Sequence, residues 1–503
     1  MHRIPRFGCG EARQVQEAGA DFPIAIIGAG FAGIGMAIQL EKAGIDSYTL
    51  FERAGEIGGT WRDNTYPGAA CDVPSHLYSL SFEQTPDWRR EYSEADEIQA
   101  YLLRLVDKWQ LREKMRLDSE IVSARFDEAA GAWTLTTRLG ESFTARVVIA
   151  GVGGLVDPAF PAIEGMANFA GQAFHSARWN RDVDLGGKRV AVIGTGASAV
   201  QIVPSIAPFV SKLSVFQRTP AWVVPKQGRV YSDAERRRLQ RSSLALRWSR
   251  LAKYGLSELR APLVMLDAPR LSAIGEKLSL DHLHAQVRDP VLREQLRPAF
   301  QFGCKRILIS DDYWAVFERG NVELVTDPIR EIRAGGIATE GGAFHALDAV
   351  IYATGFEVGF RQAAFEIIGR GGRSLEEVWR AGAVAYKGIA VAGFPNWFTL
   401  MGPNTGPGHT SVLIYTEAQI SHVLQAIRKL RARRWRSVEV RQAVQDRYNA
   451  GIQRRMRHMV WSGCKSWYQS EDGSNRALYP GFAAEYVLRA RRFNARDYEI
   501  ARF

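Results

Sequence analysis

The sequence predicts an α/β fold with two Rossmann-like dinucleotide-binding domains and a helical insertion. Three observations lead to this prediction. A buried strand, a glycine turn and a helix start follow one another twice, two further apolar strands end in small residues, and a long stretch without glycine motifs carries helical patterns. The 503 residues are enough for two or three domains that each bury a core.

The first glycine turn follows an apolar strand at 22–27, and the second follows a similar strand at 188–193; a helical run comes after each. In such a unit the first glycine permits the tight turn, the second lets a pyrophosphate approach the backbone, and a small third residue lets the helix lie close to the strand. The phosphates then face the helix N-terminus. One match is a weak signal, but two in this context predict two dinucleotide sites. The predicted contacts are Gly28, Gly30 and Gly33 in the first turn, and Gly194, Gly196, Ala197 and Ser198, followed by the small Ala199, in the second.

The residue that ends the second strand of each unit distinguishes the two ligands. Glu52 follows Gly28 by 24 positions, and Arg218 follows Gly194 by 24. A carboxylate there accepts hydrogen bonds from ribose hydroxyls and repels a 2′-phosphate, whereas a guanidinium favours that phosphate. The first unit is therefore predicted to hold FAD, and the second NADPH rather than NADH. The alternative is that both residues are ordinary surface charges.

Two later strands are expected to return the chain to the dinucleotide sheets near the cofactor crossing. They are the apolar strand at 146–150 and the strand at 348–352, which leads into Thr354. Helical patterns at Ala234 to Tyr254 and Pro290 to Gln301 indicate the insertion. The predicted organisation is the FAD-binding domain, first part, at 1–151; the NADPH-binding domain, first part, at 152–224; the helical insertion at 225–301; the NADPH-binding domain, second part, at 302–387; and the FAD-binding domain, second part, with a C-terminal closing loop, at 388–503.

Composition excludes several classes of function. Hydrophobic residues make up 46% and charged residues 24%, as in ordinary globular proteins. The net charge is +11, but the basic residues are spread out, and the densest run, Arg428 to Arg436, is typical of a solvated helix end. No nucleic-acid-binding motif is present, so we expect no nucleic-acid partner. The positive surface is instead expected to steer an anionic dinucleotide.

The cysteines and the apolar runs bear on the cellular setting. Cys9, Cys71, Cys304 and Cys464 are scattered and form no C-x-x-C pair, which argues against a disulfide framework, a zinc site or a dithiol relay. This pattern favours a reducing, cytoplasmic setting. There is no signal-peptide pattern, and no apolar run reaches the roughly 18 residues that span a bilayer. We expect no transmembrane segment, although peripheral contact with a membrane stays open.

A further motif connects the chain to a known family. It is Phe169-x-Gly171-x-x-x-His175-x-x-x-Trp179, just upstream of the second glycine turn. On this motif the chain resembles the Baeyer–Villiger monooxygenases of the flavin-containing monooxygenase superfamily, over nearly its whole length. The family's fingerprint normally ends in Pro or Asp where this chain has Asn180. Relatives that oxidise nitrogen or sulfur usually carry Tyr or Phe in place of the Trp.

Other stretches support the resemblance. The family's Lys-Arg pair is usually followed by Pro, but here by Ile307. The segment from Cys464 to Trp467 looks like the family's mobile loop, which closes over NADP. The remaining matching stretches are Gly58-Gly-Thr-Trp61, Tyr66-Pro-Gly-Ala-Ala-Cys-Asp72, Phe216-Gln-Arg-Thr-Pro220, Cys304-Lys-Arg306 and Gly402-Pro-Asn-Thr-Gly406.

The resemblance implies a reaction and its catalytic residues. NADPH reduces FAD, O2 adds at the flavin C4a, and the peroxyflavin attacks a ketone carbonyl, so that the adduct rearranges to an ester or lactone. The cofactor carries the difficult chemistry, and the protein binds, orients and stabilises charge. Arg306 would keep the peroxyflavin deprotonated and stabilise the oxyanion of the adduct. Asp72 would orient Arg306, and a purely structural ion pair is the alternative for both residues.

The resemblance also implies cofactor contacts. Lys305 would join Arg218 and Thr219 at the 2′-phosphate, and Trp467 would shield NADP when the loop closes. Trp61 and Tyr78 would lie along the flavin or nicotinamide, although both are equally typical of a core. The other expected contacts are Gly59, Thr60, Asp72 and Thr354.

Four histidines are assigned no catalytic or metal-binding role. His175 is expected to serve the linker between the modules rather than act as a base. Asp281, His282 and His284 are expected on a helix surface, so no metal site is predicted. His409 follows a glycine-rich stretch expected near the flavin, where direct catalysis is a minor alternative.

Three other functions compete with ketone oxidation. An N- or S-oxygenating enzyme could use the same scaffold, with a sulfide or amine as substrate. A flavin disulfide reductase also has two Rossmann units, but it needs a redox cysteine pair. A non-catalytic flavin-binding scaffold or redox sensor is the alternative of another class.

Overall fold

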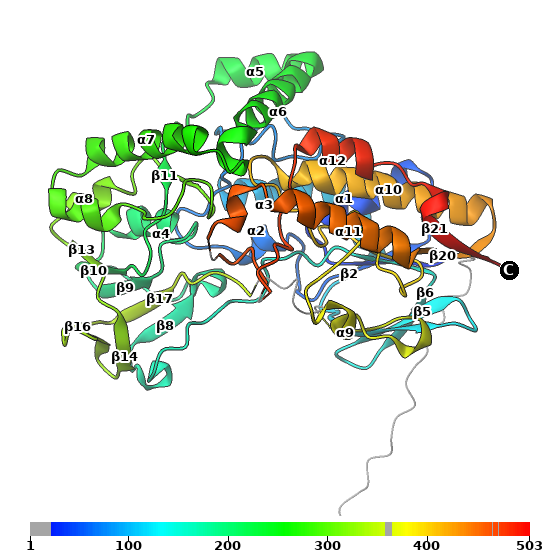
Figure 1. The fold of residues 1–503 in the computed structure, drawn as a ribbon, viewed down its shortest axis with the longest axis horizontal. Helices are drawn as coiled ribbons and strands as arrows, with labels where there is room; N and C mark the ends of the chain where they lie inside the picture. Colours follow the sequence, from blue (N-terminus) through cyan, green and yellow to red (C-terminus); the bar gives the residue numbers. More distant parts are fainter. Residues whose placement is uncertain (1–21, 358–364, 465, 471) are drawn as a thin grey trace, which may run out of the picture.

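The computed structural model describes residues 22–357, 365–464, 466–470 and 472–503. Two α/β units lie side by side, and helices cover the edge that they share at the top of Figure 1. Each unit contains a five-stranded parallel sheet. The predicted α/β fold with two dinucleotide-binding domains and a helical insertion is therefore confirmed.

The sheet of the first unit has the strand order β19-β7-β1-β2-β3, and all its strands are parallel. Strands β1 and β7 are buried along their whole length, as expected for parallel strands covered on both faces. Helices α1, α3 and α10 form the core on one face, and a four-stranded sheet packs on the other. The bounds are β1 Ile24–Ile27, β2 Tyr48–Phe51, β3 Met115–Arg116, β7 Val147–Ala150, β19 Trp397–Thr399, α1 Phe31–Lys42, α2 Thr60–Asp63, α3 Ala95–Lys108 and α10 Val412–Ala432.

The sheet of the second unit has the order β13-β10-β9-β17-β8 and is also parallel throughout. Helix α4 packs on one face, and a three-stranded sheet covers the other. The bounds are β8 Gln172–His175, β9 Arg189–Ile193, α4 Ala199–Ile206, β10 Lys212–Phe216, β13 Val322–Val325, β14 Ile329–Arg333, β15 Gly336–Thr339, β16 Phe344–Ala346 and β17 Ala349–Tyr352.

The first glycine of each turn makes an equivalent hydrogen bond to the last residue of the neighbouring strand. The amide of Gly28 donates to the carbonyl of Phe51 at 2.7 Å, and the amide of Gly194 donates to the carbonyl of Phe216 at 3.1 Å. The strand before each glycine turn has a second neighbour on its other edge: β7 pairs with β1, and β17 pairs with β9. The two later strands thus return to the dinucleotide sheets, as the sequence predicts.

The helical insertion lies between two short strands that pair with each other in parallel. Helices α7 and α8 complete the core of the second unit, while α5 and α6 lie along the top of the molecule in Figure 1. Among the described helices, none is both long and apolar enough to cross a membrane. The bounds are β11 Val223–Val224, α5 Asp233–Arg241, α6 Ser243–Met265, α7 Pro269–Gln286, α8 Pro290–Leu296 and β12 Leu308–Ile309.

Two of the expected helical runs have different limits in the structure. The run expected from Ala234 to Tyr254 divides at Ser242, whose backbone is extended and whose hydroxyl caps α6 by accepting from the amide of Ala245. The run expected from Pro290 to Gln301 ends at Leu296, because a proline at 298 disfavours helical dihedrals in the residue before it.

The chain returns to the first unit earlier than expected. Strand β18 pairs with β4, and Trp379 of α9 packs in the core of the first unit. The expected boundary at 387 is therefore too late by about twenty residues. The remaining bounds are β4 Ile121–Asp127, β5 Ala132–Thr137, β6 Ser142–Ala145, β18 Glu366–Ile368, α9 Leu375–Trp379, β20 Trp435–Val440, α11 Gln442–Met456, α12 Ala483–Ala490 and β21 Tyr498–Arg502.

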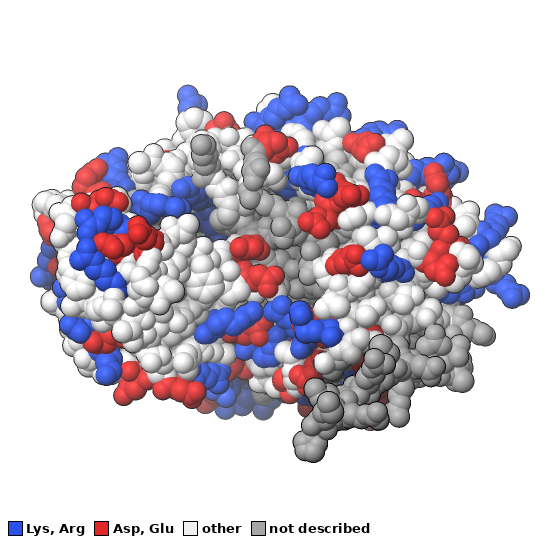
Figure 2. All heavy atoms as spheres, turned by 90° about the horizontal axis from the view of Figure 1, so that it is seen from below, with Lys and Arg blue, Asp and Glu red and all other residues white. Residues whose placement is uncertain are grey.

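Charged side chains of both signs are interspersed over the face that Figure 2 shows. The basic run at Arg428 to Arg436 begins in the last turns of α10, and its arginines at 428, 431, 433 and 434 are exposed. It is the solvated helix end that the sequence predicts.

Candidate active site

The first glycine turn has the shape that a pyrophosphate requires. Gly28 has φ +99°, and a Cβ there would lie 2.6 Å from the carbonyl oxygen of Gly151. A Cβ on Gly33 would lie 1.9 Å from the carbonyl oxygen of Gly28, so the fold itself requires these two glycines. A Cβ on Gly30, by contrast, would meet no atom within 4 Å. The middle of the turn is thus open toward the side from which a ligand would approach.

The second turn repeats this arrangement. Gly194 has φ +117°, and a Cβ there would lie 2.4 Å from the carbonyl oxygen of Ala353. A Cβ on Gly196 would meet nothing within 4 Å, and Ala197 beside it is exposed. Helix α4 begins at the buried Ala199, directly after Ser198. The residues of both turns therefore fit dinucleotide phosphates at a helix N-terminus.

Glu52 lies buried at the end of β2, beside the first turn. One carboxylate oxygen accepts a hydrogen bond from the amide of Ala29 at 2.9 Å, and the other accepts one from the guanidinium of Arg62 at 2.9 Å. Sequence reasoning did not identify Arg62, because nothing in the spacing places it next to Glu52. These two bonds fix the Glu52 carboxylate beside the first glycine turn. Its contact with a ribose stays a prediction.

Arg218 and Lys305 come together at the corresponding end of β10. Arg218 is the second residue after Phe216, the last residue of β10, and is exposed. Burial lowers the pKa of Lys305 below its ordinary value, and the nearby positive charge of Arg218 lowers it further. Neither cation forms an ion pair within the described part of the chain. The carbonyl of Thr219 accepts a hydrogen bond from the hydroxyl of Thr195 at 2.8 Å, which fixes this segment beside the second turn.

Arg306 and Asp72 form an ion pair although 234 positions separate them in the sequence. The guanidinium Nη2 of Arg306 donates to a carboxylate oxygen of Asp72. Burial disfavours the charged carboxylate, but the charge and hydrogen bond of Arg306 hold the pKa of Asp72 below its ordinary value. Asp72 in turn raises the pKa of Arg306, against the effect of burial. The Arg306 side chain keeps 45% of its surface accessible, so this fixed cation can still contact a bound molecule.

The loop that carries Asp72 also contacts the second unit. The side-chain amide of Gln201, on α4, donates to the carbonyl of Ala70 at 2.9 Å, and the hydroxyl of Tyr66 donates to Gln201 at 3.0 Å. These contacts bring the loop that carries Asp72 against α4, the helix that follows the second glycine turn.

Trp61 and Tyr78 lie together near the first turn. The indole of Trp61 donates to the hydroxyl of Tyr78 at 3.1 Å, and the ring of Tyr78 packs edge-on against Phe31, the first residue of α1. Gly59 has φ +55° and precedes α2, which begins at Thr60. Both aromatic rings are only partly buried, and they border the core of the first unit.

Comparison with known proteins identifies the family. A family model described as pyridine nucleotide-disulphide oxidoreductase matches residues 25–232. A Baeyer–Villiger monooxygenase of Pseudomonas aeruginosa is 45% identical over 95% of this chain and 91% of its own length. One of Streptomyces coelicolor is 41% identical over 95% of this chain and 92% of its own. This chain belongs to the Baeyer–Villiger monooxygenases.

The fold agrees with this family assignment. The crystal structure of OTEMO in complex with FAD and NADP superposes with a TM-score of 0.87 at 27% identity, and the match covers 96% of this chain and all of that one. This Baeyer–Villiger monooxygenase has two glycine turns, each directly after a central strand of a five-stranded parallel sheet.

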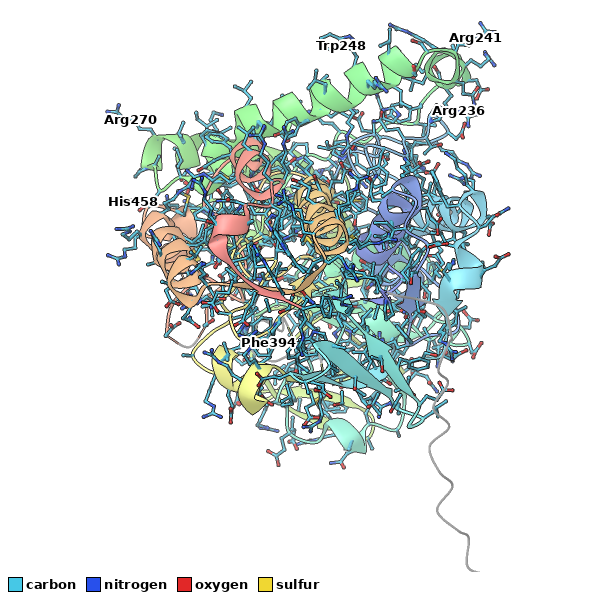
Figure 3. All side chains as sticks on the ribbon, turned by 90° about the vertical axis from the view of Figure 1, so that its right-hand side faces the viewer. Arg236, Arg241, Trp248, Arg270, Phe394 and His458 are labelled. Atoms are coloured by element: carbon cyan, nitrogen blue, oxygen red, sulfur yellow. A yellow bond between two sulfur atoms is a disulfide. The ribbon has the colours of Figure 1, made fainter. Side chains whose placement is uncertain are left out.

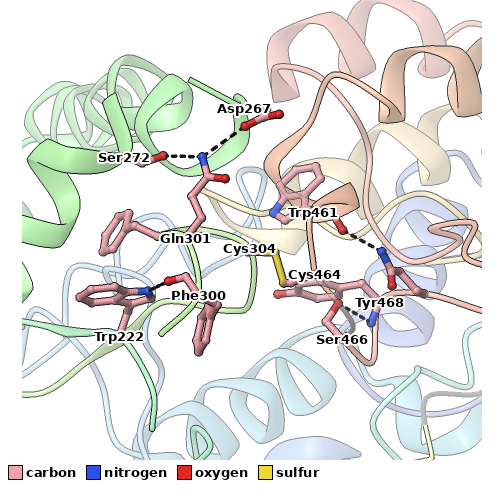
Figure 4. Close-up of a disulfide and its surroundings, with 12 residues drawn as sticks. Trp222, Asp267, Ser272, Phe300, Gln301, Cys304, Trp461, Cys464, Ser466 and Tyr468 are labelled. Carbon is pink, nitrogen blue, oxygen red and sulfur yellow. Dashed lines mark hydrogen bonds between the residues drawn. A yellow bond between two sulfur atoms is a disulfide. The ribbon is translucent and has the colours of Figure 1, made fainter. Parts of the chain in front are cut away.

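A disulfide joins Cys304 to Cys464 in this Baeyer–Villiger monooxygenase (Figure 4), and their Cα atoms are 6.1 Å apart. The expectation that the cysteines form no disulfide is therefore wrong for this pair. A separation of 160 residues carries no signal of proximity, and only the fold brings the two segments together. Cys71 is buried and free, and Cys9 lies outside the described residues.

The segment after Cys464 places two aromatic residues near the ion pair. Trp467 is 50% exposed, and its ring centroid lies 4.2 Å from that of Tyr468. Tyr468 is buried, and burial raises its pKa to about 12 while the charge of Arg306 acts in the opposite direction. Sequence reasoning named Trp467 and missed Tyr468, the residue directly after the motif. Lys465 of this motif lies outside the described residues.

Most of the remaining polar candidates have partners within the protein, and His284 is exposed on α7. The hydroxyl of Thr354 donates to the carbonyl of Ala159 at 2.5 Å. His175 is buried at the end of β8, its Nδ1 accepts from the amide of Ala177 at 3.1 Å, and burial lowers its pKa. His282 and His284 lie on α7, and the buried His409 hydrogen-bonds Glu258 at 2.9 Å.

The lowered pKa of Lys305 leads to a prediction about pH. In the free protein Lys305 loses its proton at a lower pH than an ordinary lysine, and a neutral amine binds a phosphate more weakly. We expect the KM for NADPH to rise by about tenfold as the pH passes through this depressed pKa. Lys305→Arg should abolish this rise, because a guanidinium stays charged. The KM for NADH, which lacks the phosphate, is the control, and an equal rise for both cofactors would contradict the assignment.

Proposed function

We propose that the chain is an FAD- and NADPH-dependent monooxygenase that inserts one oxygen atom of O2 next to a ketone carbonyl and forms an ester or lactone. The observation that carries this proposal is the Arg306–Asp72 ion pair, whose Asp72 lies on a loop bonded to the helix after the second glycine turn, in a chain with two turns suited to dinucleotides. The named activity of the two curated relatives supports the same reaction. Because NADPH is an intracellular reductant, we place this reaction in the cytoplasm.

Each glycine turn binds one of the two cofactors. Gly28, Gly30 and Gly33, with Glu52, hold FAD, whose bound flavin supplies electron transfer from NADPH and the activation of O2. The second turn holds the pyrophosphate of NADPH. Trp61 and Tyr78 border the flavin, and Trp467 covers the nicotinamide cofactor from the other side.

Arg306 stabilises negative charge during the oxygen insertion. When an oxygen nucleophile adds to the ketone, charge develops on the carbonyl oxygen, and a fixed cation lowers the energy of that state. Asp72 holds the guanidinium in one orientation, so little reorganisation is needed when the charge appears. Because the pKa of Arg306 is raised, the cation persists over the whole working pH range.

Arg218 makes the cofactor preference testable. Arg218→Ala removes a charge-assisted contact that only the 2′-phosphate of NADPH can make. We expect the KM for NADPH to rise by about 10- to 100-fold and the KM for NADH to change by less than about twofold. Steady-state oxidation of each cofactor measures both values. An equal change for NADPH and NADH would place the phosphate elsewhere.

The decisive experiment is a substrate panel. Cyclic, linear and aryl ketones, together with sulfides and amines, are incubated with the purified chain, NADPH and isotopically labelled O2, and the products are analysed by mass spectrometry. Labelled esters or lactones from ketones support the proposal. Labelled sulfoxides or N-oxides without any ester would indicate the other reaction on this scaffold, and a flavin that NADPH does not reduce would indicate a binding protein.

A further inference from the structure

The outer face of α6 carries a row of large apolar side chains. Leu244, Trp248, Leu251 and Leu259 all point to solvent, with Trp248 68% and Leu259 77% exposed. Their spacing places them on one side of the helix. Figure 3 shows α6 along the edge of the molecule, with Trp248 directed away from the body. We refer to these four residues as the α6 stripe.

Basic residues surround the α6 stripe. Arg247 is exposed on α6 beside the stripe, Arg260 is exposed further along α6 on the side of Lys253, and Arg237, Arg238 and Arg241 are exposed at the end of the preceding α5. None of these five arginines forms an ion pair within the described residues. Residues 232–270 contain nine Lys and Arg against four Asp and Glu. The face is therefore both apolar and strongly positive.

The acidic residues of this segment are already engaged. Asp233 pairs with Arg236 within α5, and the other three bond to residues outside the segment, Glu235 to Arg229, Glu258 to His409 and Asp267 to Gln301. Asp233 also interacts electrostatically with Arg237, and further compensation for the five arginines has to come from elsewhere. Salt and a charged partner surface are the available sources.

The inner face of α6 is fixed to the body by polar contacts. Arg250 donates to the carbonyls of His76, Leu77 and Ser79, and Lys253 pairs with Glu91. The orientation of the helix is therefore determined by specific bonds, and the α6 stripe is its outward face. Large apolar side chains that stay exposed side by side in this way mark an interaction surface.

We propose that the α6 stripe and its five arginines bind the surface of an anionic lipid bilayer. A helix with an apolar row and flanking arginines lies in the interface plane, with the row among the acyl chains and the guanidinium groups at the lipid phosphates. Helix α6 has 23 residues and would lie flat over about 35 Å of this surface. A second copy of the chain fits this face less well, because a two-fold contact would bring the arginines of both copies together.

Vesicle flotation with the full-length, flavin-loaded protein tests this proposal. The vesicles contain phosphatidylcholine alone or an equal mixture with phosphatidylglycerol. We expect binding to the mixed vesicles at low salt, at least about a tenfold weaker binding at high salt, and little binding to phosphatidylcholine alone. Reduction of the bound flavin by NADPH confirms that each variant is folded.

Two variants and two matched controls locate the contact. Trp248→Ser/Leu251→Ser removes apolar side chains, and Arg247→Glu/Arg260→Glu reverses charge; each should weaken binding by about tenfold or more. Leu139→Ser changes a leucine that is even more exposed, on the loop between β5 and β6, and Arg431→Glu/Arg433→Glu makes the same charge change at the end of α10. Both controls should bind as the wild type does.

Three results would overturn the proposal. The wild type could fail to float with anionic vesicles, or the two α6 variants could float as well as the controls. Light scattering could also show a wild-type dimer that Trp248→Ser/Leu251→Ser converts to a monomer, which would make the α6 stripe a subunit interface.

Discussion

Arg306→Ala is expected to lower the rate of ester formation by about 100- to 1000-fold, because the ketone oxygen loses the cation that stabilises its developing charge. The glycine turns and Glu52 are untouched, so flavin content and the oxidation of NADPH should persist. Ester formation and NADPH consumption, measured in the same assay, separate the two steps. The variant should therefore consume NADPH without forming product.

Two further variants make this prediction specific. Arg306→Lys keeps the charge but loses the planar fork that Asp72 orients, so it should retain part of the activity. Arg431→Ala removes an exposed arginine at the end of α10 and should have no effect. Ester formation by Arg306→Ala at the wild-type rate would remove Arg306 from the mechanism.

Glu52→Arg is expected to yield a protein without FAD. The substitution puts a second guanidinium next to Arg62 in a buried position and removes the acceptor of the Ala29 amide. Loss of the charged hydrogen bond to the ribose costs about 1.5–3 kcal/mol, which corresponds to a loss of FAD affinity of about 10- to 100-fold, and the added guanidinium displaces the ribose further. The ratio of flavin to protein absorbance after purification measures this loss.

The control for Glu52→Arg is Glu52→Gln, which keeps the shape and an acceptor oxygen and should keep part of the flavin. Binding of NADPH to the second unit shows that the arginine variant is folded, since its site uses separate residues. A fully flavin-loaded Glu52→Arg protein would show that Glu52 does not contact the ribose.

The parts of the fold that could be predicted are those that depend on local geometry. Gly28 and Gly194 need positive φ angles, and the buried strands before them have an unmistakable apolar pattern. The break of the insertion at Ser242 was missed, because the helical pattern continues through it. The early return of the chain at β18 was missed too, since a three-residue strand has almost no periodicity.

The candidate site was predictable only in part. The resemblance supplied Arg306 and Asp72, and the structure brings them into contact, but neither residue type nor spacing relates positions so far apart. Arg62 and Tyr468 were missed for the same reason. The disulfide was missed because scattered cysteines look alike whether or not they pair. Which residues pair over long sequence separations depends on the tertiary fold, and a single sequence carries no direct signal of such contacts.

The bond between Cys304 and Cys464 limits how far the C-terminal loop can travel. Trp467 is three residues beyond Cys464, so its backbone can swing through a radius of only about 10 Å around that anchor. At the other end of the bond, Arg306 is two residues beyond Cys304. While the sulfurs are joined, the indole and the guanidinium are tethered to a common point, and a reductant would release the loop from that tether.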